Sequence, residues 1–174
     1  QERAACIALY DELLRRTRDL SGSGEVAAAN ALPLSGQEPL LPVELDGHPL
    51  VPPAAPLLWA GAVSPAYLRV LGIPLLRGRA FDDTDGERTA PVVLVSASTA
   101  RRYWPDQDPI GKRIRVVWDE HWRTVVGVVG DVRQYELSGR TPAEITGAVY
   151  MPYPQAVALN RQIPISMALF VRSS

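Results

Sequence analysis

The chain has 174 residues, of which 47% are apolar and 21% are charged, and its formal net charge at pH 7 is -1. A chain of this length buries about 70% of the surface that it exposes when unfolded, so it can form a core without metals or disulfides. Its nearly neutral charge and scattered arginines argue against a domain that neutralises nucleic-acid phosphates, and its apolar content excludes a disordered segment.

The first predicted element is a helix over residues 2–20. Apolar residues recur there at spacings typical of one helix face, and they are Cys6, Ile7, Tyr10, Leu13, Leu14 and Leu20. Arg15, Arg16 and Arg18 lie in the last turns, where they oppose the negative end of the helix dipole, and Gly22 ends the helix.

The rest of the chain is typical of short strands joined by stiff loops, because 16 residues are proline. Apolar or alternating segments predict strands at residues 25–32, 43–45, 57–63, 73–76, 92–95, 113–118, 124–132, 148–153 and 165–172. The segments 113–118 and 124–132 form a predicted hairpin, residues 98–104 a helix closed by Pro105, and residues 81–91 and 154–164 loops.

A compact strand–helix–strand unit is predicted around residues 64–72. Ser64 can cap this helix, Pro65 suits its first position and Gly72 ends it. The helix is too short for a dinucleotide-binding crossover, and no glycine-rich phosphate loop precedes it.

Neither a leader nor a membrane span is visible. Gln1 is not an initiator methionine, and no charged region followed by an apolar one comes after it. The uncharged run 49–68 contains five prolines, which exclude a spanning helix. We therefore expect a water-soluble piece of a longer polypeptide, cut at both ends.

Residue types that carry chemistry are few. Cys6 is the one cysteine in the sequence, so an intrachain disulfide, a CxxC metal site and an iron–sulfur cluster are excluded. The two histidines are His48, in a turn sequence, and His121, at the hairpin tip; neither accompanies a GxSxG motif. We interpret both as solvent-exposed turn residues whose replacement leaves function intact.

Two further motifs resemble sites only in part. Asp82, Asp83 and Asp85 suggest a calcium loop, but Val92 falls where an EF-hand needs its bidentate carboxylate, so we expect a solvated acidic loop. Gly127 and Gly130 lie within or at the end of a strand with no helix after them, which favours close packing or a bulge over a nucleotide loop. We assign no catalytic, metal or cofactor residue.

Four longer strings carry a family resemblance, and they follow one another in the family's order. Residues 63–81, VSPAYLRVLGIPLLRGRAF, resemble the VSPxYfxxLGIPLLrGRxF segment of the MacB-like periplasmic core domain of ABC permeases with an FtsX-like membrane part. Residues 91–114, 122–133 and 149–155 resemble its PVVLVNxxxARRxWPxxDPIGKRI, WxTVVGVVGDVR and VYxPxxQ stretches, and residues 31–36 a common start. These strings are structural signatures.

The change in sequence character near Phe81 predicts an α+β fold with a mixed sheet in two lobes. Residues 1–81 with 147–174 would form a membrane-proximal, porter-like lobe that contains the strand–helix–strand unit. There the helices at 2–20 and 64–72 would pack on one face of a sheet of the strands near 26–32, 57–63, 73–76, 148–153 and 165–172. Residues 82–146 would form an inserted, β-rich, sabre-like lobe. We also expect the first helix and the last strand to bring the two chain ends side by side at one pole.

The function implied is that of a non-enzymatic, extracytoplasmic domain, on the periplasmic or extracellular side of the cell membrane. It would relay ATP-driven motion of its permease's membrane helices to export or extraction of substrate. Implied partners are the chain's own transmembrane segments, a cytoplasmic ABC ATPase, and a periplasmic adaptor or second permease copy, with no nucleic acid and no cofactor. Relatives export or extract macrolides, lipoproteins, peptides and lipids.

Two other classes stay open. A solute- or peptide-binding module would show a deep apolar pocket with convergent polar groups. An enzyme would show a buried pair of titratable groups in opposed environments.

Overall fold

Strands dominate the computed structural model, which describes residues 2–20, 24–33, 39–47, 55–117, 119, 121–132, 145–159 and 167–172. The elements are α1 (Glu2–Leu20), β1 (Glu25–Ala29), β2 (Leu40–Leu45), β3 (Leu57–Val63), α2 (Tyr67–Val70), β4 (Leu75–Gly78), β5 (Val92–Ser96), α3 (Ala97–Tyr103), β6 (Arg113–Val116), β7 (Arg123–Val129), β8 (Ile145–Pro152), α4 (Tyr153–Leu159) and β9 (Ala168–Arg172). The predicted α+β class with a mixed sheet is confirmed.

The strands form one sheet in the order β2-β6-β7-β5-β8-β3-β1-β9, and β2 also pairs with β3. The extra pairing closes β2, β6, β7, β5, β8 and β3 into a ring. The first half of β2 pairs with β3, and Val43–Leu45 in its second half pair with β6. Because each ring strand has a neighbour on both sides, this part of the sheet has no exposed edge.

The ring encloses one hydrophobic cluster. Every ring strand contributes residues to it, and in β2, β3, β5 and β8 these residues alternate along the strand. They are Val43, Leu45, Leu58, Ala60, Val93, Val95, Ile114, Val125, Val128, Val149 and Met151. Trp59 and Tyr150, on the outer face, belong to a second cluster with residues of α2 and β1. The ring therefore has a filled interior and one covered outer face.

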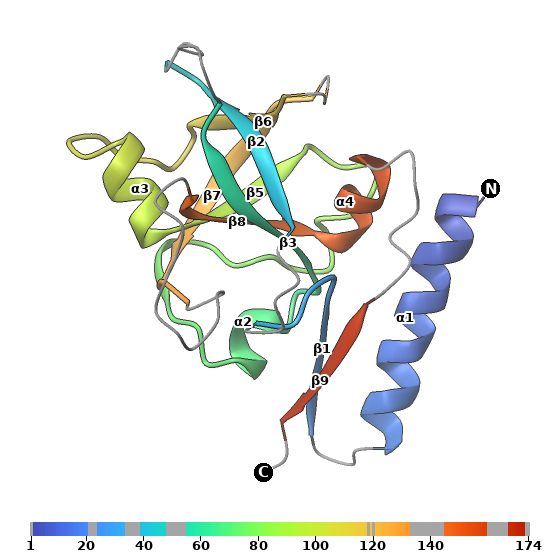
Figure 1. Cartoon of the computed structure of the whole chain (residues 1–174). Coiled ribbons are helices and arrows are strands. Elements are labelled where there is room, and N and C mark those ends of the chain that lie inside the picture. Colours follow the sequence, from blue (N-terminus) through green and yellow to red (C-terminus); the bar gives the residue numbers. More distant parts are fainter. Residues whose placement is uncertain are drawn as a thin grey trace.

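Outside the ring, β1 and β9 form a two-stranded ribbon. They pair antiparallel from Glu25↔Arg172 to Ala29↔Ala168, whereas β1 joins β3 only through Ala29↔Val63. Figure 1 shows this ribbon beside the long helix α1, away from most of the ring strands.

The two predicted helices near the ribbon lie on opposite faces of it, so our expectation that they share a face is wrong. Val26 belongs to a cluster with Leu14 of α1. Ala27, the next residue along β1, belongs to the cluster that contains Tyr67 of α2. Successive strand residues point to opposite sides, and the ribbon is therefore held between α1 and α2.

The strand–helix–strand unit also differs from the prediction. α2 spans only Tyr67–Val70, and Ser64 does not cap it, because its hydroxyl accepts a hydrogen bond from the Ala28 N–H at 2.9 Å. Gly72 ends the turn with φ 66°, as expected. The strand predicted at 73–76 is β4, which pairs with β7 rather than with β3.

The remaining elements agree with expectation except at one place. β6 and β7 pair antiparallel as the predicted hairpin. The loop expected at 154–164 begins with helix α4, and residues 160–164 lie outside the described residues.

The division into two lobes stays a prediction. The last strand pairs with β1, inside the expected membrane-proximal lobe. However, β2 and β4 pair with β6 and β7, across the expected boundary.

The described ends of the chain lie apart. β9 ends beside the start of β1, close to the end of α1, while Glu2 lies at the other end of that helix (Figure 1). At a rise of 1.5 Å per residue, a helix of 19 residues is about 28 Å long. Our expectation of adjacent ends is therefore wrong. Among the described residues, no helix is both long and apolar enough to cross a bilayer.

Candidate functional site

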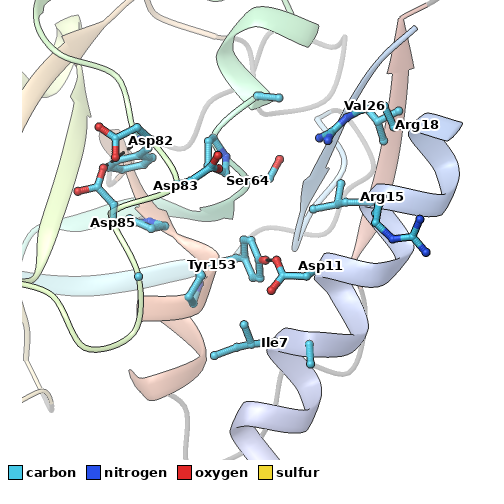
Figure 2. A pocket seen from close by; sticks show the side chains of 18 of the residues that line it. Ile7, Asp11, Arg15, Arg18, Val26, Ser64, Asp82, Asp83, Asp85 and Tyr153 are labelled. Carbon is cyan, nitrogen blue, oxygen red and sulfur yellow. Dashed lines mark hydrogen bonds between the residues drawn. The ribbon is translucent and has the colours of Figure 1, made fainter. Parts of the chain in front are cut away.

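A groove of about 980 Å³ lies between α1 and the body of the molecule. Its walls come from the inner face of α1, the start of β1, residues 64–66, the loop at 81–87 and the start of α4 (Figure 2). These segments are distant in sequence, and the fold brings them around one opening.

The groove exists because α1 packs loosely. Among its residues only Leu14 is buried, and it packs against Val26, Ala28, Ala62 and Tyr153. Towards the start of the helix the lining residues are Ala4, Ile7 and Ala8. Two of these three side chains are methyl groups too short to reach the opposite wall, so the space stays open.

Tyr153 is the polar link across the groove. Its side chain is buried, and its hydroxyl donates a hydrogen bond to Oδ1 of Asp11 on α1 (Figure 2). The ring of Tyr10 meets the Tyr153 ring edge-on, with centroids 6.4 Å apart. Burial, the hydrogen bond to Asp11 and the nearby charges of Asp11 and Asp83 raise the pKa of Tyr153, so the phenol stays protonated at neutral pH.

The acidic loop is less solvated than the sequence predicts. Asp82 and Asp83 are exposed, but only 5% of the Asp85 side chain is exposed, and both of its carboxylate oxygens accept hydrogen bonds from Arg79, at 2.7 and 2.8 Å. Asp85 also accepts from the Asp82 N–H at 3.1 Å. The expectation of a fully solvated loop is therefore wrong at Asp85. Over the described ranges, no group of three or more His, Cys, Asp or Glu residues could hold a metal ion.

Gln155, which sequence reasoning quoted only as part of a string, ties this loop to the body. Its Oε1 accepts from the Val92 N–H at 3.0 Å. Its Nε2 donates to the carbonyl oxygens of Gly86 and Ala90 and to the hydroxyl of Thr89, each at 3.2 Å. The sequence signal is a glutamine shortly after the predicted strand at 148–153; its burial is visible only in the structure.

The other residues singled out from the sequence take structural places. His121 is exposed, with 71% of its side chain accessible and Nδ1 3.2 Å from Asp119, and His48 lies outside the described residues. A Cβ on Gly127 would lie 2.4 Å from the carbonyl oxygen of Arg79, and one on Gly130 2.8 Å from the ring of Pro74. The pairing of β5 with β7 also shifts register beside Gly127. Close packing with a bulge is confirmed there.

The strings quoted from the sequence lie within, or overlap, a longer stretch that matches a known protein family. Residues 46–173 match the family described as the MacB-like periplasmic core domain. The chain belongs to this family. It is the periplasmic or extracellular domain of a MacB-like ABC transporter permease, and it is not itself the catalytic part.

One curated relative and two solved structures agree with this family. The chain is 35% identical over 95 residues to the probable syringafactin export ATP-binding/permease protein SyfD of Pseudomonas syringae pv. tomato, covering 54% of this chain and 13% of that protein. The chain thus spans only a small part of that relative.

The solved structures show the fold. The periplasmic region of MacB from Actinobacillus actinomycetemcomitans superposes with a TM-score of 0.62 at 18% identity, over 90% of this chain and 62% of that one. The extracellular domain of the noncanonic ABC-type transporter YknZ from Gram-positive bacteria gives 0.60 at 14% identity, over 93% and 71%.

Proposed function

We propose that this MacB-like domain relays motion from the membrane helices of its permease to substrate outside the membrane. An ABC ATPase on the cytoplasmic side would drive that motion, and the export or extraction of substrate would follow from it. The chain's partners would be its own transmembrane segments and, through them, the ATPase. A periplasmic adaptor or a second permease copy would receive the motion.

The observation that carries the proposal is the docking of α1. The helix is attached to the body along one strip, through Leu14, the partly buried Ile7 and Tyr10, and the Asp11–Tyr153 hydrogen bond, with an open groove beside it. A helix held this way can change its angle to the ring without breaking the ring's core. Because β1 follows α1 directly, a displacement at Glu2 reaches the β1–β9 ribbon.

The relay is tested in the parent permease together with its ATPase. Spin labels on Arg3, at the start of α1, and on Asp106, on an exposed turn of the body, report the angle of the helix after Cys6 is replaced by Ser. We expect their distance distribution to differ between the nucleotide-free and ATP-bound states. A second pair within the body, on Leu76 and Arg102, should not change.

Two variants of α1 sharpen the test. Leu14→Asp places a charge in the docking strip and should abolish the ATP-dependent distance change. Leu9→Asp makes the same change where 56% of the side chain is exposed and should preserve it. If ATP does not change the distance distribution in the labelled protein with Leu14 unchanged, the proposal is wrong.

The groove gives some support to the second candidate, a solute-binding module. Its volume lies near the upper end of the usual range for ligand sites, which is about 300–1,000 Å³.

A further inference from the structure

The charge that lines the groove is unbalanced. Six carboxylates and three arginines line it: Asp11, Glu25, Asp82, Asp83, Asp85 and Glu87, with Arg15, Arg18 and Arg69. The formal charge of the lining is therefore -3. Clefts lined by one sign of charge concentrate ligands of the other sign.

Arg79, which is not part of the lining, pairs with Asp85 and lies 3.8 Å from Asp82, so it offsets part of this excess. The arginines of the lining offset little more. Arg15 is held by Glu12 and Asp19, at 2.8 Å each, and Arg69 is held by Glu25 at 2.8 Å. Neither guanidinium is therefore available to compensate the carboxylates across the groove.

Three carboxylates of the lining have no cationic partner among the described residues. Asp11 bonds the neutral Tyr153 hydroxyl. Asp83 and Glu87 have no hydrogen bond or ion pair with any of the described residues.

Two of these carboxylates stand on different walls of the groove. Asp11 projects from α1 and Asp83 from the loop at 81–87, and Tyr153 lies between the two segments (Figure 2). A cation in the groove would be attracted by carboxylates on both walls, an anion would be repelled, and a neutral group would gain nothing from the charge. The charge pattern therefore selects a positively charged group.

Part of the groove wall near these carboxylates is apolar. Ile7 projects into the groove from α1, and Leu14, Val26 and Phe81 form buried parts of its lining. A small inorganic cation would leave this apolar surface exposed to water. A ligand with an apolar part would cover it, and burying this surface would add to its binding free energy.

We infer that the groove binds a small organic cation that carries an apolar part. Its ammonium or guanidinium group lies on the acidic side of the groove, near Asp83 and Glu87, and its apolar part covers Ile7 and the helix face around it. The site adds a ligand to the relay of the proposed function. Its test uses neither ATP nor a membrane, so its failure leaves the relay proposal standing, and failure of the relay leaves the ligand site standing.

The test compares three amphiphiles that share a dodecyl chain and differ in charge, each below its micelle-forming concentration. Dodecyltrimethylammonium, dodecyl sulfate and dodecyl maltoside are titrated into the chain at low salt. Affinity is read by calorimetry, and the site by amide NMR shifts at Ala8 and Gly86, which line the groove. We expect the cation to bind at least tenfold more tightly than the maltoside, with weakening in 0.5 M NaCl because salt screens the carboxylates.

Matched variants test which carboxylates bind the cation. Asp83→Asn with Glu87→Gln should weaken binding of the cation at least tenfold and leave the maltoside unchanged. Asp106→Asn, an exposed carboxylate away from the groove, should change neither. Equal affinity for all three amphiphiles, preference for the sulfate, no binding of the cation, or the same loss in Asp106→Asn would each overturn the inference. NMR spectra of the variants show that they remain folded.

Discussion

Ser64 and Ala28 exchange two hydrogen bonds across the junction between β1 and β3. The Ser64 N–H donates to the carbonyl oxygen of Ala28, and the Ala28 N–H donates to the Ser64 hydroxyl oxygen, both at 2.9 Å. Both residues are buried. The serine thereby extends the short contact between the ring and the ribbon by one side chain.

Replacement of Ser64 by Ala should lower the free energy of unfolding by about 1–3 kcal/mol, because the Ala28 N–H would be left buried without an acceptor. Urea unfolding followed by circular dichroism measures the change. Thr84→Ala removes a hydroxyl that bonds Asp82 on the exposed loop, and should cost less than about 0.5 kcal/mol. Equal costs for the two variants would contradict the buried role of Ser64.

Gly127 lies where two segments approach too closely for a side chain. A Cβ there would lie 2.4 Å from the Arg79 carbonyl oxygen and 2.8 Å from Cδ2 of Leu94. Gly127→Ala should therefore lower the free energy of unfolding by about 1–3 kcal/mol or more. Gly86→Ala is the control, since nothing lies within 4 Å of its Cβ position. A Gly127→Ala variant as stable as the control would show that β4 and β7 can separate without cost.

The sequence predicts an element well where apolar residues repeat over several turns or where a turn residue marks the element's end. The spacing of apolar residues in α1 and the alternation in β6 depend on neighbours along the chain, and both elements form as expected. The sequence does not predict α4, because Pro154 favours a loop there. Proline is tolerated in the first turn of a helix, where its missing N–H has no partner to lose.

Tertiary contacts explain the features that the sequence did not predict. Ser64 has the residue type of a helix cap, but its hydroxyl finds a strand N–H that lies 36 residues away. β4 follows α2 closely and yet pairs with β7, because Gly127 admits the backbone of the segment after β4.

The groove has no local signal. Its walls come from five separated segments, and the carboxylates that give it a negative charge are spread over several of them. The acidic loop itself is visible in the sequence, but the burial of Asp85 depends on Arg79, whose direction the sequence does not specify.

The stability of α1 should depend on pH through Glu12. The guanidinium groups of Arg15 and Arg16 lower the pKa of Glu12 to about 2, from an ordinary value of 4.5. Because the folded pKa lies below the unfolded one, the ion pairs stabilise the helix above pH 4.5 and this contribution is lost as the pH falls towards 2.

An NMR titration of the Glu12 side-chain carboxyl measures this pKa. Arg15→Gln should move it upwards towards its ordinary value, because the hydrogen bonds from Arg15 lower this pKa most and would be lost. Arg3→Gln removes an exposed arginine elsewhere on the same helix and should leave it unchanged. A Glu12 pKa that is the same in both variants would show that the pairs of the helix surface do not persist in solution.

Asp119 and Arg123 form a buried ion pair at the hairpin, with side chains 7% and 6% exposed and Nη2 3.1 Å from Oδ2. The pair is asymmetric. Within the described structure, Nε and Nη1 of Arg123 are buried without a hydrogen-bond partner. Asp119 has a second donor, the N–H of His121, at 3.0 Å. Loss of the carboxylate therefore isolates a buried charge, whereas loss of the guanidinium does not.

Asp119→Asn should accordingly lower the free energy of unfolding by about 3–5 kcal/mol, the usual cost of leaving one partner of a buried pair uncompensated. Arg123→Met should cost less, because it removes the unpartnered donors together with the charge and keeps the length of the side chain. The double variant should be more stable than Asp119→Asn alone, since no buried charge is left. Asp46→Asn, in the exposed pair with Arg113, should cost at most about 1 kcal/mol. Urea unfolding of the four variants measures these differences, and strictly additive costs at positions 119 and 123 would show that the two side chains do not depend on each other.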